Sequence, residues 1–333
     1  MTLETILAHF EQNQAHLSFP ERLHTAIQQL VQLTPEIPHP AHGRTYQRWQ
    51  ILAQVAATDL NLVKWFESHL DALSILQELG QPVSDADAAT RLWAVWAAEG
   101  SQKPICFDDG LISGEKTWCS AASLVGYGLM TYRNAQQQSQ LLLVDMQQAN
   151  IDIDTTDWQA VGMQHTQTAK ITFENVVANK IANPDDYLSR AGFWHGAAGV
   201  AACWYGAAVR LAAFLQQACD RQDNHYRLMY LGQVNTQLAT VKHSFQQLAQ
   251  QIDAVPSQSH ELAVRILRAN VEQAALQVLD QVGKALGARP FCDNEIFARL
   301  AADLPVFLRQ SHAAHDLEHI GKLSVQEHVT WML

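Results

Sequence analysis

The chain has 333 residues, enough for two or three compact units. A content of 48% hydrophobic and 17% charged residues excludes an intrinsically disordered protein, and a net charge of −11 with only 22 basic residues argues against a nucleic-acid-binding surface. The five cysteines form no C-x-x-C pair, so we expect neither a disulfide framework nor a cysteine zinc site. This cysteine usage and an N-terminus without signal-peptide features favour the reducing cytoplasm.

The first part of the chain, up to about residue 92, has apolar residues at helical spacing. We expect helices over residues 6–17, 20–33 and 46–79, the last ended by Gly80 and Pro82. A further helix is predicted over residues 85–99, and it carries Trp93 and Trp96.

The period changes to two over residues 103–184. Asp109 and Gly110 stand between two short apolar runs and predict a tight hairpin over residues 105–113, because both residue types accept a positive φ. Further strands are expected over residues 128–133, 140–146, 151–158 and 171–177. Several short antiparallel strands indicate a small barrel or a sandwich, and the pattern does not choose between them.

The last part of the chain is again helical, with long helices expected over residues 191–217, 229–252, 261–286 and 304–323. The run 191–209 is apolar enough to resemble a membrane span, but its Gly and Ala content favours a buried helix. The predicted fold class is therefore α+β: an N-terminal helical domain (1–102), an antiparallel β-barrel or sandwich domain (103–185) and a C-terminal four-helix bundle (186–333).

Two segments carry a family resemblance. GLISGEKTWCSAAS, which begins at Gly110, resembles the G-x-K-x-W-x-(S/T) segment of the acyl-CoA dehydrogenase flavoproteins. The stretch from Gly162 to Val176 resembles the strand that closes their middle domain. The resemblance runs from about Trp93 to Leu323, while the N-terminal part is shorter and less similar. It implies a helical, β, helical enzyme that binds FAD, forms a homodimer or homotetramer, and desaturates an acyl thioester carried by CoA or a carrier protein.

The resemblance also implies cofactor-binding residues. Trp118, Cys119 and Ser120 would lie at the flavin ring, where an indole can stack and a hydroxyl can hydrogen-bond the ring; the alternative is an ordinary core tryptophan. Thr166 and Thr168 could reach a phosphate or a ring edge, or be ordinary strand threonines. Gly287 and Arg289, at the end of a predicted helix, would contact the dinucleotide half of FAD; the alternative is an ordinary helix C-cap at Gly287.

Desaturation requires a base that takes the α-proton while a hydride passes to flavin N5. The family places a glutamate in one of two segments, and neither motif is intact in this chain. The nearest candidates are Glu318 and Asp316 near the C-terminus, with His195 on the long apolar helix as a titratable alternative. Because Asp316 and Glu318 are two residues apart in a helix, at most one of them can face the flavin.

Three other functions stay open at this point. Relatives with this fold include flavin monooxygenases and oxidases that lack the conventional glutamate. A metal site is the second alternative, since His312, His315 and His319 would share one face of a helix. The third is a degenerate helical scaffold without catalytic activity. We favour an enzyme without a resident metal.

Overall fold

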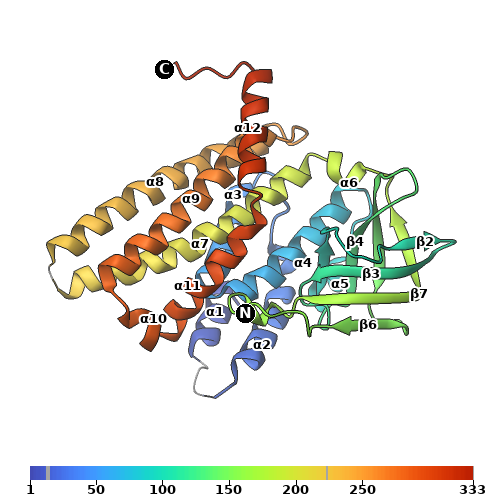
Figure 1. The fold of residues 1–333 in the computed structure, drawn as a ribbon, viewed down its shortest axis with the longest axis horizontal. Coiled ribbons are helices and arrows are strands. Elements are labelled where there is room, and N and C mark those ends of the chain that lie inside the picture. Colours follow the sequence, from blue (N-terminus) through green and yellow to red (C-terminus); the bar gives the residue numbers. More distant parts are fainter. Residues whose placement is uncertain (13–15, 223, 333) are drawn as a thin grey trace. The chain divides into compact units, whose positions relative to one another are not determined.

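The computed structural model describes residues 1–12, 16–222 and 224–332 (Figure 1). Within these ranges the chain forms two compact units that do not follow its linear order. One unit combines residues 1–39 with residues 61–193, and the other combines residues 40–60 with residues 194–333. The domain boundaries expected at residues 102 and 185 stay a prediction.

The first unit contains N-terminal helices and all the strands. Its helices are α1 (Leu3–Gln12), α2 (Phe19–Gln32), η2 (Thr34–Glu36), α4 (Leu60–Glu78), α5 (Asp85–Thr90), η3 (Gln164–Thr166) and α6 (Asp186–Ser189). Its strands are β1 (Trp93–Trp96), β2 (Cys106–Asp108), β3 (Leu111–Cys119), β4 (Tyr127–Arg133), β5 (Ser139–Asp145), β6 (Ile151–Asp154) and β7 (Ala169–Ile181).

The seven strands form one sheet in the order β1-β4-β5-β7-β3-β2, and β6 also pairs with β7. The long strand β7 contacts β3 and β6 through its first part and β5 through its last residues. The path of paired strands in the described chain is open, with β1 and β2 at its ends. The predicted β2–β3 hairpin is confirmed, and Asp109 (φ 42°) and Gly110 (φ 82°) both adopt the left-handed conformation that its turn requires.

The core of the first unit lies between α4 and the sheet. Ala72, Leu73 and Leu76 of α4 pack with Trp93, Leu129 and other strand residues in one buried cluster. Helix α4 is buried along nearly its whole length, and β4 and β5 are buried at most positions rather than at alternate ones, so these elements lie inside the unit. The helix therefore fixes the sheet that carries the sequence-predicted ring site.

In the second unit, the elements formed by the described residues are all helices. It contains α3 (Thr45–Thr58), α7 (Gly192–Arg221), α8 (His225–Ala254), α9 (Glu261–Leu286), α10 (Arg289–Asp293), α11 (Glu295–Phe307), η4 (Leu308–Gln310) and α12 (Ala314–Gln326). Trp49 and Tyr205 both contact the ring of Phe245 at centroid distances of 5.5 Å, so α3 and α7 share a core with α8. The long helices predicted over residues 191–286 are confirmed.

Helix α7 is the only helix in the described ranges that is long and apolar enough to cross a membrane, and 67% of its most apolar window is buried inside the structure. Small residues allow this burial. An ideal Cβ on Gly206 would lie 2.1 Å from the carbonyl oxygen of Ala53 in α3. The expectation of a buried helix therefore agrees with how α7 packs.

Three predicted helices have different boundaries in the structure. The helix predicted over residues 46–79 is interrupted at Asp59, whose backbone is extended (φ −160°) and whose carboxylate pairs with Arg299 at 3.2 Å. The helix predicted over residues 85–99 ends at Thr90, and residues 93–96 form β1 instead. Pairing with β4 overrides the local helical pattern there. The two strands are parallel, whereas the sequence pattern predicted antiparallel strands.

The prediction of one final helix over residues 304–323 is wrong, because the structure has two helices there, α11 and α12, with other boundaries. Helix α11 begins earlier, because the side chain of Asn294 accepts a hydrogen bond from the backbone N–H of Phe297. A new helix, α12, then starts after a break at Ala313 (φ 41°). The helix expected over residues 6–17 includes residues 13–15, which lie outside the described residues.

Candidate functional site

The sequence motif around Trp118 lies at the irregular end of β3. The register between β3 and β7 shifts between Lys116 and Cys119, so the chain bulges where Trp118 stands. Trp118 has a positive φ of 63°, rare for a bulky residue, and its side chain is 63% exposed. The ring of Trp158 meets it edge to face at a centroid distance of 6.2 Å. The bulge thus turns a large aromatic side chain outward beside a second one.

Ser120, Thr166 and Thr168 come together next to this bulge. Ser120 Oγ lies 3.0 Å from Thr168 Oγ1, which lies 2.9 Å from Thr166 Oγ1. Thr166 and Thr168 are buried, with 2% and 8% exposure, whereas Ser120 is half-buried. The sequence reasoning therefore selected three residues that the fold brings into one hydrogen-bonded group, although the threonines face inward rather than toward solvent.

Two buried indoles hold the backbone of this group. Trp96 Nε1 donates to the carbonyl of Ser120 at 3.1 Å, and Trp65 Nε1 donates to the carbonyl of Thr166 at 2.9 Å. The carbonyl of Thr166 also accepts the backbone N–H of Ala121. These bonds tie β3, β1 and α4 to the turn before β7, so the position of Ser120 is fixed from several elements.

Left-handed backbone conformations gather in the same place. Trp118, Ala121, Met163 and Gln167 all have φ between 49° and 63°, although none of them is glycine. Each such residue costs on the order of 1–3 kcal/mol, and strain of this kind concentrates at functional sites. The cluster is therefore an independent reason to regard the Trp118–Ser120 segment and the turn before β7 as a site.

Cys119 points the other way. Its side chain is fully buried, its Sγ lies 3.5 Å from the carbonyl oxygen of Lys116, and burial raises the pKa of the thiol far above its usual range. The thiol is therefore neutral and enclosed. A bound molecule would meet the backbone of Cys119 rather than its sulfur.

Lys116 supports the site from inside the sheet. The residue is 2% exposed, and its ammonium group lies 2.5 Å from the carbonyl oxygen of Thr131 and 3.3 Å from Glu99 Oε1. Burial lowers the pKa of Lys116, and the charge of Glu99 partly opposes this. Thr131 Oγ1 also donates to Glu99 at 2.7 Å. Lys116 and Thr131 thus hold the loop after β1, where Glu99 stands, against the sheet.

The other sequence-predicted residues lie in the second unit. His195 is buried on α7, and its Nε2 donates to the carbonyl oxygen of Gln258 at 2.9 Å. Gly287 (φ 71°) is the C-cap of α9, as the structural alternative expected. Arg289 begins α10, with its side chain 87% exposed and paired with Asp293 at 3.0 Å.

The two candidate bases share helix α12 but differ in environment. Asp316 Oδ1 pairs with Arg265 at 2.7 Å, and its Oδ2 accepts the backbone N–H of His312 at 3.0 Å. Glu318 is exposed and pairs with Lys322 and His319; the hydrogen bond from Lys322 is the main cause that lowers the pKa of Glu318. Asp316 thus stabilises the start of α12, and Glu318 is ionised and solvated.

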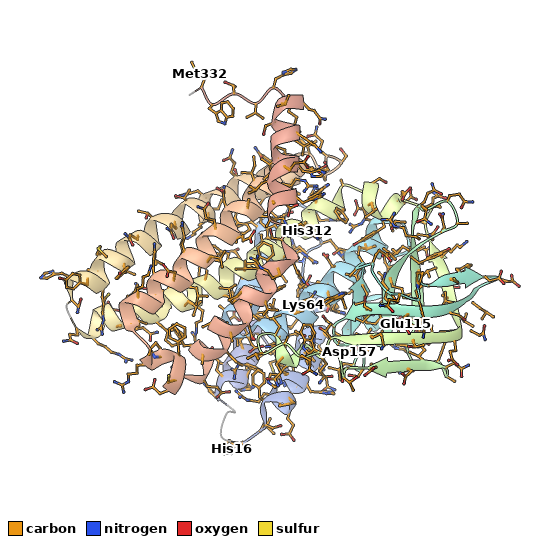
Figure 2. All side chains as sticks on the ribbon, in the orientation of Figure 1. His16, Lys64, Glu115, Asp157, His312 and Met332 are labelled. Carbon is orange, nitrogen blue, oxygen red and sulfur yellow. The ribbon has the colours of Figure 1, made fainter. Side chains whose placement is uncertain are left out.

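The three histidines of the metal alternative do not share one helical face. His312, labelled in Figure 2, lies before α12, whereas His315 and His319 lie within it. The rings of His315 and His319 are 4.3 Å apart, but those of His312 and His315 are 6.3 Å apart. Among the described residues, no group of three or more His, Cys, Asp or Glu side chains is arranged to hold a metal ion.

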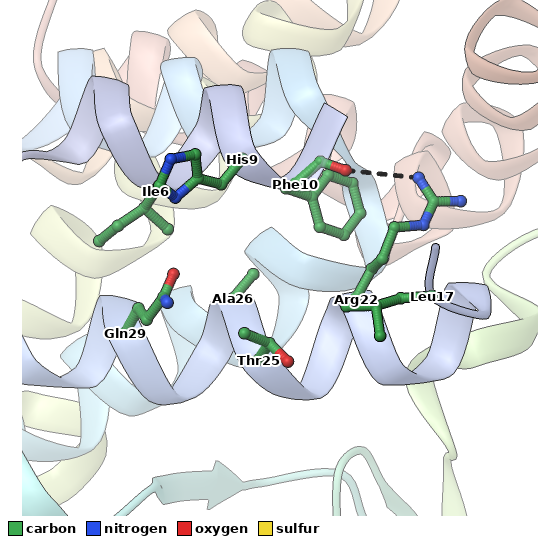
Figure 3. A pocket seen from close by; sticks show the side chains of 8 residues that line it. All are labelled: Ile6, His9, Phe10, Leu17, Arg22, Thr25, Ala26 and Gln29. Carbon is green, nitrogen blue, oxygen red and sulfur yellow. Dashed lines mark hydrogen bonds between the residues drawn. The ribbon is translucent and has the colours of Figure 1, made fainter. Parts of the chain in front are cut away.

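Cavities that the sequence did not indicate lie among the described residues of the first unit. A small one of about 50 Å³ lies between α1 and α2, where Arg22 Nη1 donates to the carbonyl of Phe10 at 3.4 Å (Figure 3). It has room for a few waters and is too small for a cofactor. A larger one of about 700 Å³ lies between α2, the end of α5 and the start of β4, with His24 and Arg91 in its lining. None of the ring-site residues named above belongs to either lining, as far as the chain is described.

Sequence reasoning did not select Trp158 or Met163 as site residues. Trp158 reaches the site only because the β3 bulge exposes Trp118, and its Nε1 donates to the carbonyl of Met163 at 3.3 Å. Met163 contributes this backbone carbonyl and one of the left-handed backbone conformations of the site. A side-chain motif gives no signal for either role, since both depend on the turn before β7.

Comparison with known proteins yields no matching family model and no matching curated protein. Solved structures, in contrast, match over nearly the whole chain. Methanesulfinate monooxygenase MsuC from Pseudomonas fluorescens is 15% identical, with a TM-score of 0.75 over 98% of this chain and 94% of its own. TdsC from Paenibacillus sp. A11-2, solved with FMN and indole, is also 15% identical, with a TM-score of 0.75 over 98% and 95%.

Butyryl-CoA dehydrogenase from Megasphaera elsdenii is 12% identical, with a TM-score of 0.77 over 97% of both chains. At these identities the likeness concerns the fold. It agrees with the helical, β, helical order and with the resemblance of the Gly110–Ser123 and Gly162–Val176 segments. The chain is therefore a divergent member of the acyl-CoA dehydrogenase fold.

Proposed function

We propose that this protein is a flavin-dependent oxidoreductase and that the flavin ring lies against Trp118 and Ser120. The observation that carries the proposal is the strained bulge at Trp118, which exposes an indole beside a partly exposed hydroxyl in a chain with this fold. An indole supplies an apolar face for the ring, and a hydroxyl supplies a hydrogen bond to its edge. The four left-handed residues give the site a rigid backbone, as a binding surface requires.

We favour a monooxygenase reaction over desaturation. When bound, reduced flavin supplies two electrons, so that substrate and dioxygen give oxygenated substrate, water and oxidised flavin. This reaction does not require an enzyme carboxylate that removes an α-proton from a thioester. The candidate carboxylates support this choice, because both oxygens of Asp316 are bonded and Glu318 is a solvated ion with a lowered pKa.

The chain's own residues would bind and orient in this reaction. Trp118 and Trp158 would wall the ring site, and Ser120 would fix the ring by a hydrogen bond. Lys116 would keep the loop of Glu99 in place at the neighbouring edge of the sheet. His195, the titratable candidate from the sequence, donates its Nε2 hydrogen to the carbonyl oxygen of Gln258 within the second unit.

Desaturation of an acyl thioester is the second candidate. The fold shared with butyryl-CoA dehydrogenase favours it, and Glu318 is exposed enough to be reached by a substrate. In this case the cofactor would be FAD, with Gly287 and Arg289 near its dinucleotide half, and the protein would act as a cytoplasmic homo-oligomer. TdsC binds FMN, so the monooxygenase candidate is compatible with FMN as well.

Flavin binding is tested first. We expect the purified protein to be yellow, or to bind FMN or FAD with quenching of its tryptophan fluorescence. Trp118→Leu should weaken binding and remove much of the quenching. Trp331→Leu changes a tryptophan outside the site that is even more exposed, at 87% against 63%, and should leave affinity unchanged. A protein that binds neither flavin would refute the proposal.

The reaction class is tested next. If the protein is a monooxygenase, its bound reduced flavin should react rapidly with oxygen after unbound flavin has been removed, since free reduced flavin consumes oxygen without any enzyme. A dehydrogenase should instead lose its flavin colour anaerobically when mixed with one member of a panel of acyl-CoA thioesters. Anaerobic bleaching that disappears in Glu318→Gln, with slow oxygen consumption, would establish desaturation and overturn our preference.

A further inference from the structure

The hydroxyl groups of the site form a chain that ends on a backbone carbonyl. Thr166 Oγ1 donates to the carbonyl oxygen of Met163 at 2.9 Å, and the distances from Thr166 to Thr168 and from Thr168 to Ser120 are 2.9 and 3.0 Å. Thr166 and Thr168 are almost fully buried. Their hydroxyls therefore bond within this chain rather than to solvent.

The carbonyl of Met163 at one end determines which hydroxyl is the donor and which is the acceptor in each of these hydrogen bonds. A hydroxyl has one hydrogen to donate, and a carbonyl oxygen can only accept. Because Thr166 gives its hydrogen to Met163, the bond between the threonines must be donated by Thr168. The hydrogen of Thr168 is then used as well, so the next bond must be donated by Ser120.

Ser120 is left with lone pairs and no hydrogen for a ligand. Its side chain is the only partly exposed member of the three, so this is the oxygen that a bound molecule meets. A ligand atom with an N–H forms a good hydrogen bond there, whereas an acceptor atom meets lone pairs. The buried threonines thus decide which hydrogen-bonding partner the surface serine accepts.

We propose that Thr166 and Thr168 are positioning residues that make Ser120 an obligatory acceptor, so that the site prefers reduced over oxidised flavin. This inference rests on the proposed function. Position N5 of the flavin ring carries a hydrogen in the reduced state and a lone pair in the oxidised state. Only the reduced ring can donate from N5 to Ser120.

The test is an anaerobic titration of the protein, freed of flavin, with reduced FMN and with oxidised FMN, followed by tryptophan fluorescence. We expect reduced FMN to bind about tenfold more tightly, because it gains one hydrogen bond to Ser120 where oxidised FMN would place two lone pairs against each other. In a protein that retains its flavin, tenfold corresponds to a midpoint potential raised by about 30 mV for a two-electron couple.

Thr166→Val is the decisive variant. It keeps the shape of the side chain but removes the acceptor for Thr168, so Thr168 can donate to Ser120 and free the serine hydrogen for the ligand. The carbonyl of Met163 keeps the N–H of Thr166 and Trp158 Nε1 as donors, which limits the structural cost. The preference for reduced FMN should fall about tenfold.

Two matched variants separate this effect from a general effect of replacing a threonine. Thr166→Ser keeps the hydroxyl and should keep the wild-type preference. Thr172→Val makes the same substitution in strand β7, which follows the turn, and outside the group of hydrogen-bonded hydroxyls, so it should also keep the wild-type preference. Should Thr166→Val fail to fold, Thr168→Val tests the same point, since it frees the hydrogen of Ser120 directly.

Equal affinity of the wild type for both states, or an unchanged ratio in a folded Thr166→Val variant, would overturn the inference while leaving the proposed function intact. Contact of Ser120 with the N3–H group, which is present in both states, would give that result. Absence of FMN and FAD binding in either state would overturn both the proposed function and this inference.

Discussion

Replacing Gly206 by alanine should destabilise the protein, although alanine favours helices. Gly206 lies in α7, and an ideal Cβ there would be 2.1 Å from the carbonyl oxygen and 2.7 Å from the carbonyl carbon of Ala53 in α3. Real Cβ atoms do not approach other atoms within 3.0 Å, so the two helices must move apart by about 1 Å. Such a shift loosens the contacts that α3 makes along α7.

The magnitude follows from two opposing effects. Overpacking a close helix contact costs roughly 1–3 kcal/mol or more. Alanine gains about 1 kcal/mol over glycine in a helix interior. Since a backbone carbonyl cannot rotate away as a side chain can, the upper part of the first range applies. We therefore expect Gly206→Ala to lower the free energy of unfolding by about 2 kcal/mol.

Gly232→Ala is the matched control. Gly232 lies inside α8, and an ideal Cβ there has no atom within 4 Å, so only the helix propensity changes. We expect this variant to gain up to about 1 kcal/mol. Urea unfolding followed by circular dichroism measures both. A Gly206→Ala variant as stable as Gly232→Ala would refute the close packing of α3 on α7.

Asp253→Ala should cost about 2–3 kcal/mol in urea unfolding, because the carboxylate accepts from the backbone N–H and the hydroxyl of Thr45 at the start of α3; a loss below about 0.5 kcal/mol would contradict this capping role. Lys116→Met should change the free energy of unfolding by less than about 1.5 kcal/mol, since it removes a hydrogen bond but also a buried charge, whereas Glu99→Gln should cost more because the buried ammonium loses its counter-charge. The opposite order of these two variants would refute the assignment. Burial raises the pKa of Tyr187 to about 12. Its unfolded pKa is about 10, so deprotonation favours the unfolded chain and stability should fall by about 2–3 kcal/mol between about pH 10 and pH 12. Tyr187→Phe should remove this part of the loss, and an identical alkaline decline in both proteins would argue against it.

Local patterns predicted the elements whose structure is decided locally. The long helices after residue 190 have apolar stripes and clear ends, and the Asp109–Gly110 turn requires residue types that tolerate a positive φ. Strand β1 was mistaken for a helix because its identity depends on pairing with β4, which follows about thirty residues later. The start of α11 has a local signal in the sequence, the N-cap residue Asn294, but the prediction placed the start of the helix at residue 304 and did not use it.

The candidate site was only partly predictable for the same reason. The motif identified Trp118 and Ser120, and the next segment identified Thr166 and Thr168, so the residues that meet in space were available from sequence. The direction of their hydrogen bonds was not, because it is set by the carbonyl of Met163 in a turn with left-handed residues. The carboxylates of α12 were likewise identified without their partners, Arg265 and Lys322.

The assignment of residues 40–60 to the same unit as the C-terminal helices affects how the protein can be made. The chain passes between the two units at residues 39–40, 60–61 and 193–194, so no single cut separates them. During synthesis α3 leaves the ribosome long before α7 and α8 are made. Trp49 of α3 therefore stays exposed until Phe245 of α8 is available to cover it. We therefore expect a fragment that begins at residue 186 to be poorly soluble alone, and to be rescued by a separate peptide that supplies residues 40–60.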